Sequence, residues 1–384
     1  MDASNLEPKG HDMKTFDYLS MSGKPSANEE RTLLERWFSI YPEQERSELR
    51  RRMESKEQEF YSAFFELFLY ASLKQMGAAV QIHPDVSDEI LKHPDFLVCL
   101  PSGYEFYLEA VVASGQSDEE RSAVNAKNAF YASLDRKLQS PDYFWSVTIH
   151  SQGKSSPSAK QVVHGLREYQ KTLNIRDVIT EFEEKGFDTP CRYVWNHDGW
   201  LVHFVPIPKA EDARGKPESR PLGSFHMPKA ICCDDDEDIR TSVKFKIKHH
   251  GEVDKPYMIA VAATGDFAEQ EDFMNAIYGT VVYEMNTKTG EGRNVRQGDG
   301  VWSGDDGPKN NHLVAVLGAW KLFPYSIPRA NVVIFENPYI DPVGDLAALD
   351  FPHWLRNGSK PEYRPGRSPG EIHGLDPKWP SFEA

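Results

Sequence analysis

The chain has 384 residues, and its 44 Lys and Arg residues against 59 Asp and Glu residues give a formal net charge of −15. Hydrophobic residues make up 39% of the chain and aromatic residues 12%, which is enough apolar surface for a core and excludes wholesale disorder. The acidic balance excludes coating of a polyanion by a broad basic surface, although it leaves room for a local basic groove.

The cysteines and the apolar runs indicate the cellular compartment of the protein. The four cysteines, Cys99, Cys191, Cys232 and Cys233, are irregularly spaced and predict no disulfide framework, which fits a reducing compartment. The N-terminus has no apolar signal-like stretch, and no apolar run approaches the ~18–20 residues that a spanning helix needs. We therefore expect a cytoplasmic protein with no membrane partner.

The N-terminal quarter is predicted to be extended at first and then helical. Residues 1–28 are polar and turn-rich, and we expect them to be disordered or extended. A short helix is predicted over 28–41. Pro42 suits the first turn of a long helix that runs to residue 76, where Gly77 ends it.

Strands and helices alternate through the rest of the chain. Three strand-like runs lie between residues 78 and 113, and Ser117 begins a capping box for a helix to residue 138. Further strands are predicted at 144–150, 191–195, 200–206, 257–263, 280–285, 313–318 and 331–336. Further helices are predicted at 158–172, 174–186, 234–250 and 269–278. Two long loops are predicted at 207–233 and 286–311. This alternation predicts an α/β fold with a mixed central β-sheet flanked by helices. We expect one elaborated domain over 29–344 and a Pro-rich C-terminal tail over 345–384.

Three acidic residues are notable for their apolar surroundings. Glu66 lies within the run 64–69, Asp95 follows Pro94 at the start of an apolar strand, and Glu109 lies within the apolar run 106–112. A lone buried carboxylate is unfavourable, so each must be neutralised, paired or bound to a cation. Each acid taken alone also has a purely structural interpretation. Glu66 can be a helix residue paired with an arginine, Asp95 a turn residue, and Glu109 a half-exposed strand residue. Together they can converge at one end of the sheet, where oxygen ligands suit Mg²⁺.

These acids also carry a resemblance to a known family. Glu66, Pro94-Asp95-Phe96 and Leu108-Glu109-Ala110-Val111 resemble the PD-(D/E)XK nuclease superfamily, in particular a bacterial branch in which small apolar residues follow the strand acid. Similar segments continue to about residue 340, at 255–261, 276–279, 300–302 and 336–339. The resemblance implies a restriction-endonuclease-like core with its motifs in 57–150 and a C-terminal elaboration. It also implies that Asp95 and Glu109 bind Mg²⁺ or Mn²⁺, and that Glu66 supports the ion or its water as a third metal-site acid.

The chain departs from the superfamily pattern at one position. The superfamily's lysine, two residues after the strand acid, falls at Val111. That lysine orients the attacking water or stabilises charge that develops on the phosphoryl group. Lys127 in the following helix is the candidate substitute, and a lysine of the 244–248 cluster is its rival. The structural interpretation of Lys127 is a solvated helix residue.

The charged segment 234–250 has a structural interpretation that we prefer to a metal or DNA site. Its acidic residues, 234–238, come first, and Lys244, Lys246 and Lys248 come last, which complements the dipole of a helix. Core and turn roles are expected for three residues of the later family-like segments, Trp302, Asn337 and Tyr339.

The sequence leaves three functions open. The first is an Mg²⁺-dependent nuclease that hydrolyses phosphodiester bonds of DNA, with Glu66, Asp95, Glu109 and Lys127 as catalytic residues. The second is a catalytically degenerate nuclease-like fold that binds nucleic acid or protein, which Val111 and the charge of −15 favour. The third is a hydrolase of unrelated chemistry that uses the loop 286–311 as a lid. A homodimer is compatible with each.

Overall fold

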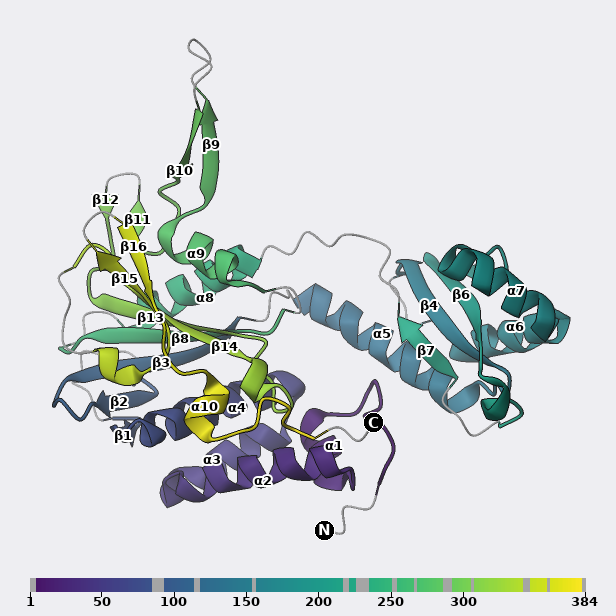
Figure 1. The fold of residues 1–384 in the computed structure, drawn as a ribbon, viewed down its shortest axis with the longest axis horizontal. Helices are drawn as coiled ribbons and strands as arrows, with labels where there is room; N and C mark the ends of the chain where they lie inside the picture. The colour runs from purple at the N-terminus through teal and green to yellow at the C-terminus, as the bar shows by residue number, and fades with distance from the viewer. Residues whose placement is uncertain are drawn as a thin grey trace. The chain divides into compact units, whose positions relative to one another are not determined.

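The fold is described from a computed structural model, in which the chain forms two compact units. The first unit comprises Met1–Glu7, Lys14–Gly115 and Cys233–Ala384, and the second comprises Pro8–Met13 and Gln116–Cys232. Each unit is treated by itself below (Figure 1). The structure describes residues 5–84, 93–113, 118–153, 157–216, 221–225, 235–250, 254–265, 268–285, 292–304, 307–340, 346–357 and 360–381.

Four helices open the first unit. They are α1 (Thr15–Met21), α2 (Pro25–Ile40), α3 (Glu43–Glu54) and α4 (Glu57–Gln75). Helix α1 and the start of α2 therefore lie within residues 1–28, which were expected to be disordered or extended. The long helix predicted over 42–76 is interrupted at Ser55, whose ψ of −127° is not helical, so that its charged half is α3 and its apolar half is α4. Almost every residue of α4 from Phe60 onward is buried.

The first unit is built on an eight-stranded mixed sheet, which confirms the predicted α/β class. Antiparallel strands β1, β2 and β3 lead to β8, which is parallel to β3, and β13 is parallel to β8. β14 is antiparallel to β13, β15 is parallel to β14, and β16 is antiparallel to β15. In spatial order the strands are β1 (Ala79–Ile82), β2 (Phe96–Cys99), β3 (Glu105–Ala113), β8 (Tyr257–Ala263), β13 (Leu313–Trp320), β14 (Asn331–Glu336), β15 (His353–Asn357) and β16 (Lys360–Arg364).

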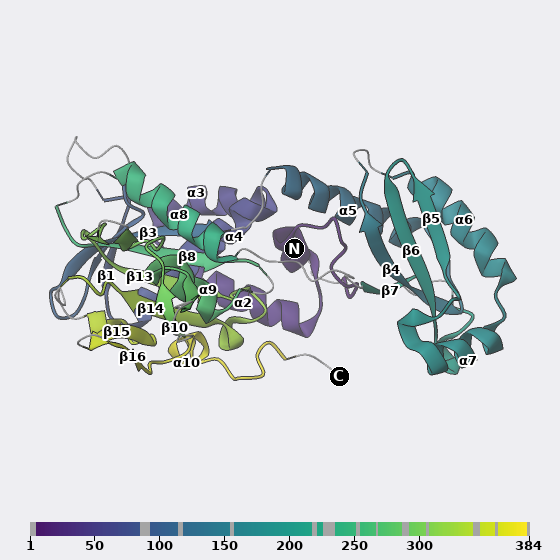
Figure 2. The same cartoon turned by 90° about the horizontal axis from the view of Figure 1, so that it is seen from above.

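Helices cover both faces of this sheet. Helices α2, α3 and α4 lie on one side, and α8 (Asp235–His250) and α9 (Gln270–Tyr278) lie on the other (Figures 1 and 2). Strand alternation divides the central strands between two cores. Leu108 and Met258 pack with α4, whereas Tyr107, Ile259 and Val261 pack with residues of α8 and α9.

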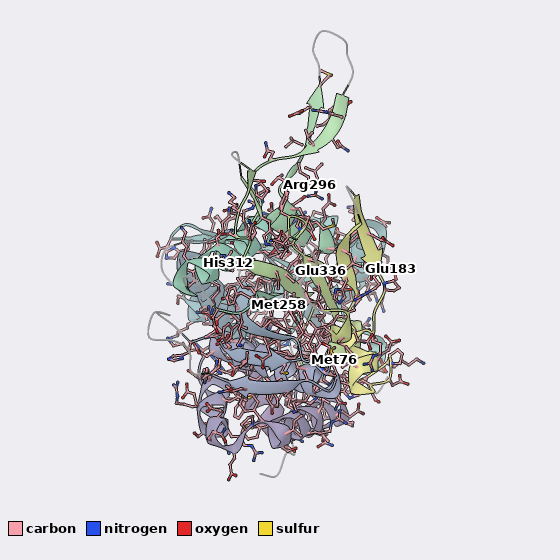
Figure 3. The ribbon with its side chains drawn as sticks, turned by 90° about the vertical axis from the view of Figure 1, so that its left-hand side faces the viewer. Met76, Glu183, Met258, Arg296, His312 and Glu336 are labelled. Atoms are coloured by element: carbon pink, nitrogen blue, oxygen red, sulfur yellow. The ribbon has the colours of Figure 1, made fainter. Side chains whose placement is uncertain are left out.

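A two-stranded ribbon pairs the strand predicted over 280–285 with part of the segment predicted as the loop 286–311. It consists of β9 (Val281–Met285) and β10 (Gly292–Arg296), paired in antiparallel register. It extends away from the rest of the unit, and Arg296 lies at its base (Figures 1 and 3). A short pair, β11 (Ser303–Gly304) and β12 (Gly307–Pro308), follows it.

The C-terminal segment, expected to be an extended tail, contributes to the first unit. It supplies β15 and β16 to the sheet and the short helix α10 (Pro369–His373). His373 of α10 is buried, and its Nε2 lies 3.0 Å from Ser72 Oγ of α4. The segment is therefore packed against the core.

The second unit has a sheet and a core of its own. Its four strands are ordered β5 (Tyr193–His197), β6 (Trp200–Pro208), β4 (Tyr143–Ser151) and β7 (Leu222–Phe225). Its helices are α5 (Asp118–Lys137), α6 (Ala159–Thr172) and α7 (Ile175–Lys185). Trp145 and Trp200 of the sheet pack with Leu134 of α5 and Leu166 of α6. The chain thus has two units where one domain over 29–344 was expected. The predicted capping residue Ser117 lies outside the described residues.

No helix in the described ranges combines the length and the apolar character needed to cross a membrane.

Candidate functional site

The β2–β3 hairpin brings Asp95 and Glu109 together. Phe96 pairs with Leu108 in the antiparallel register, so Asp95 lies beside Glu109 where β2 begins. The Asp95 amide donates a hydrogen bond to Glu109 Oε2 at 3.2 Å, and the Ala110 amide donates to Asp95 Oδ2 at 2.7 Å. Glu109 is fully buried, on the face of β3 that packs against α8. It is not the half-exposed strand residue of the structural interpretation.

Glu66 is buried on α4 and holds two partners. The Tyr41 hydroxyl donates to Glu66 Oε1 at 2.5 Å, and Arg52 of α3 forms an ion pair with Glu66 Oε2. Burial, followed by the charge of Glu66, raises the pKa of Tyr41, so that hydroxyl stays protonated and donates. Both carboxylate oxygens of Glu66 thus accept hydrogen bonds, and the arginine partner is the one expected for a buried helix acid.

The charges of Glu66 and Glu109 both act on Asp95. Burial, followed by the negative charges of Glu109 and Glu66, raises the pKa of Asp95 to about 6. Lys246 and the Ala110 amide act in the opposite direction. A carboxyl group whose pKa is raised by neighbouring negative charges lies at a place that attracts a cation.

The basic residue at this site is Lys246. Its Nζ forms an ion pair with Glu109 Oε1, and α8 carries it onto the face of β3 that Glu109 occupies. Val111 is half-buried in β3 and packs with the neighbouring core. The sequence did place Lys246 within the 244–248 cluster, but it gave no signal that singled it out, because the whole charge gradient of this helix is also explained by the helix dipole.

Lys127, the first candidate for the missing lysine, belongs to the second unit. There its Nζ lies 5.8 Å from the centre of the Tyr131 ring, on α5. Tyr41, Arg52, Ala110 and Lys246, which contact the three acids, belong to the first unit. Lys246 therefore replaces Lys127 as the lysine to be tested first.

The donor set fits Mg²⁺ in part. Magnesium is commonly held by one or two carboxylates, with water and substrate phosphates as the other ligands. Asp95 and Glu109 are adjacent across the hairpin and can supply two such oxygens, although those of Glu109 already accept from the Asp95 amide and from Lys246. Glu66 lies on a separate element, α4, and its oxygens accept from Tyr41 and Arg52. Within the described ranges, no group of three or more His, Cys, Asp and Glu side chains is placed to share one ion. A two-carboxylate site with Glu66 behind it fits better than a three-acid cage.

The other sequence candidates have structural partners. Asp236 and Glu237 of the acidic run pair with Arg240, one turn further along α8. Trp302 Nε1 and Asn337 Nδ2 both donate to the Leu313 carbonyl, at 3.1 and 3.0 Å, which gives these two residues the expected core and turn roles.

Comparisons with protein-family models, with curated proteins and with solved structures found no match for this chain.

Proposed function

We propose that the first unit is a metal-dependent nuclease that hydrolyses phosphodiester bonds of DNA. The observation that carries this proposal is the contact between Lys246 and Glu109, beside Asp95. It puts a positive charge next to the buried carboxylate of Glu109 and the partly buried carboxylate of Asp95, although the strand position that would supply a lysine holds Val111. A restriction-endonuclease-like core, as implied by the resemblance of these motifs, is part of the same proposal.

Each residue has a role that its surroundings support. Asp95 and Glu109 would hold Mg²⁺ or Mn²⁺, which when bound lowers the pKa of a coordinated water and offsets charge on the phosphoryl group. Lys246 donates hydrogen bonds to the attacking water or to a phosphate oxygen, as the strand lysine would have done. Glu66 is a positioning residue. With Tyr41 and Arg52 it fixes α3 and α4 behind the hairpin, and its charge favours a cation at Asp95.

The test is cleavage of supercoiled plasmid and of a labelled duplex in Mg²⁺ and Mn²⁺. Removing one catalytic group from such a site should reduce the rate by roughly 10²-fold or more. We expect this loss for Asp95→Asn, Glu109→Gln and Lys246→Met. Lys248→Met is the matched control, because Lys248 is exposed on the same helix. Lys127→Met tests the first sequence candidate. Full activity in Asp95→Asn and Glu109→Gln would end the nuclease proposal.

The engagement of Glu66 favours a second candidate function. With both oxygens of Glu66 taken and the strand lysine absent, the fold can serve as a nucleic-acid- or protein-binding module without catalysis. Calorimetric titration with Mn²⁺ separates the two functions. Binding that is lost in Asp95→Asn supports the nuclease, whereas nucleic-acid binding without metal binding or cleavage supports the module.

A further inference from the structure

The β9–β10 ribbon has one face that the nuclease site leaves unexplained. In its register Val281 lies opposite Arg296, Tyr283 opposite Asn294, and Met285 opposite Gly292. Directly opposed residues point to the same side of a sheet. These six residues therefore form one face, called the ribbon face below. Its three large apolar side chains are exposed, Tyr283 by 66%, Met285 by 58% and Val281 by 39%.

The chemistry of the ribbon face differs from that of the protein as a whole. The chain carries a net charge of −15, yet none of the six residues of this face is acidic. Glu284 and Arg293 oppose each other on the other face, with 3.7 Å between the guanidinium and the carboxylate, so their charges offset there. A side chain at Gly292 would begin only 2.1 Å from the Tyr283 hydroxyl, which shows that the tyrosine ring lies across the ribbon.

The base of the ribbon is fixed to the rest of the first unit. The Thr280 amide and hydroxyl donate to the Asp299 carboxylate at 2.8 and 2.7 Å, which closes the ribbon where its two strands meet the body. Arg296 Nη1 donates to the Gly279 carbonyl at 2.6 Å (Figure 3). The ribbon is therefore held at its root while its face stays exposed.

Helix α8 connects this base to the acids. Lys244 Nζ donates to the Asp299 carbonyl at 3.0 Å, and Lys246, two residues further on, pairs with Glu109. Two residues advance a helix by about 3 Å and turn it by about 200°, so the base of the ribbon and Glu109 lie on opposite sides of one helix, about a helix diameter apart and within reach of one duplex. Burial, followed by the positive charge of exposed Lys309, lowers the pKa of Lys244.

We propose that the ribbon face enters the major groove of duplex DNA, with Lys244 and Lys309 against the phosphate backbone between the groove and the acids. The proposal rests on the nuclease function proposed above. A two-stranded ribbon has the dimensions that the major groove admits. Tyr283 supplies an aromatic surface, Met285 an apolar contact and Asn294 an amide that can bond to base edges.

A second copy of the chain fits this face less well. A stable dimer needs about 800 Å² from each partner, which the six side chains of a narrow ribbon face cannot supply. DNA gains its affinity from the adjoining basic residues and does not need a large apolar area.

Fluorescence anisotropy with a labelled 30-base-pair duplex in EDTA tests the proposal on the full chain. Tyr283→Ser/Met285→Ser should weaken binding by about tenfold or more without changing the slope of log K against log salt, because no charge is lost. The matched control is the exchange Glu284→Arg/Arg293→Glu on the other face, which keeps the net charge and should bind like wild type. Lys309→Ala should reduce the magnitude of the salt slope by about 0.9.

The outcomes separate this proposal from the nuclease proposal. The docking proposal is overturned if the serine variant binds the duplex like wild type, if wild-type protein binds no duplex, or if single strands bind more tightly than the duplex. It is also overturned if light scattering shows a wild-type dimer that becomes a monomer in the serine variant. Duplex binding that needs the ribbon face, without cleavage in Mg²⁺ or Mn²⁺, supports the docking and removes only the nuclease function.

Discussion

The ion pair between Lys246 and Glu109 should be visible in stability as well as in catalysis. Glu109 is fully buried and the lysine side chain is only 12% exposed, so Lys246→Met leaves a buried carboxylate without its cation. We expect a loss of about 3 kcal/mol in the free energy of unfolding, measured by urea denaturation at pH 8.

Two further variants show whether this loss of unfolding free energy comes from the unpaired charge. Glu109→Gln/Lys246→Met removes the charge together with its partner, and should recover most of the stability. Lys248→Met should change it by less than about 0.5 kcal/mol. Equal losses in the single and double variants would show that the pair contributes nothing beyond packing.

Glu30 is a buried carboxyl on α2 whose titration should make stability fall as the pH rises. Burial, followed by the charge of Glu29, raises its pKa from 4.5 to about 7. The folded state therefore holds this proton more tightly, and the resulting stabilisation is complete below pH 4.5 and lost as the pH rises through 7. Glu30→Gln should add up to about 3 kcal/mol at pH 8 and almost nothing at pH 4. Thermal unfolding at both values measures the difference, and an equal gain at both would contradict it.

The sequence predicts the acidic residues of the site better than its lysine, for a physical reason. Asp95 and Glu109 are carried by a hairpin, and strand alternation and a short turn fix their relation locally. The partnership of Lys246 with Glu109 depends on how α8 packs on β3, across a separation of 137 residues. The contacts of Tyr41 and Arg52 with Glu66 also depend on tertiary packing. They require the chain to change direction at Ser55, so that α4 packs against α3.

At the scale of elements, a single glycine determines how α9 packs on the sheet. A side chain at Gly318 of β13 would begin 2.6 Å from the Phe273 ring and 3.0 Å from Phe335, and these two rings are stacked. Gly318→Ala should destabilise the first unit by about 1–3 kcal/mol through overpacking, as measured by urea denaturation. Phe273→Leu in the same chain should reduce the effect, and Gly10→Ala, which meets no atom within 3.4 Å, is the control. A neutral Gly318→Ala would show that α9 shifts freely.

Strands made of apolar or β-forming residues were predictable, and a strand with few of either was missed. Strands β3, β8 and β13 are apolar runs bounded by turn residues, and each was predicted within a few residues of its bounds. The exposed strand β9 was still predicted, over 280–285, because its Val and Tyr residues favour strands. β10 is largely exposed on both faces, so it has no apolar alternation and was taken for part of a loop. The interruption at Ser55 was missed because the helical pattern of 42–76 continues on both sides of it.

At the scale of the whole molecule, the chain carries cores that do not share residues. The core of the second unit draws on buried residues between Phe130 and Leu222, and the two cores of the first unit draw on none of them. Separate cores are the structural basis of independent unfolding. We therefore expect two calorimetric transitions for the full chain.

Matched substitutions can assign these transitions. Val147 of β4 and Val316 of β13 are both fully buried, one in each unit. Each valine-to-alanine change removes the same two methyl groups and should cost about 2 kcal/mol, or roughly 5 °C in the melting temperature of its own unit. Val147→Ala should lower one transition and Val316→Ala the other, and in the double variant each transition should fall by the shift of its own single variant. If either single variant moves both transitions together, the units unfold as one cooperative body, and the second unit stabilises the first.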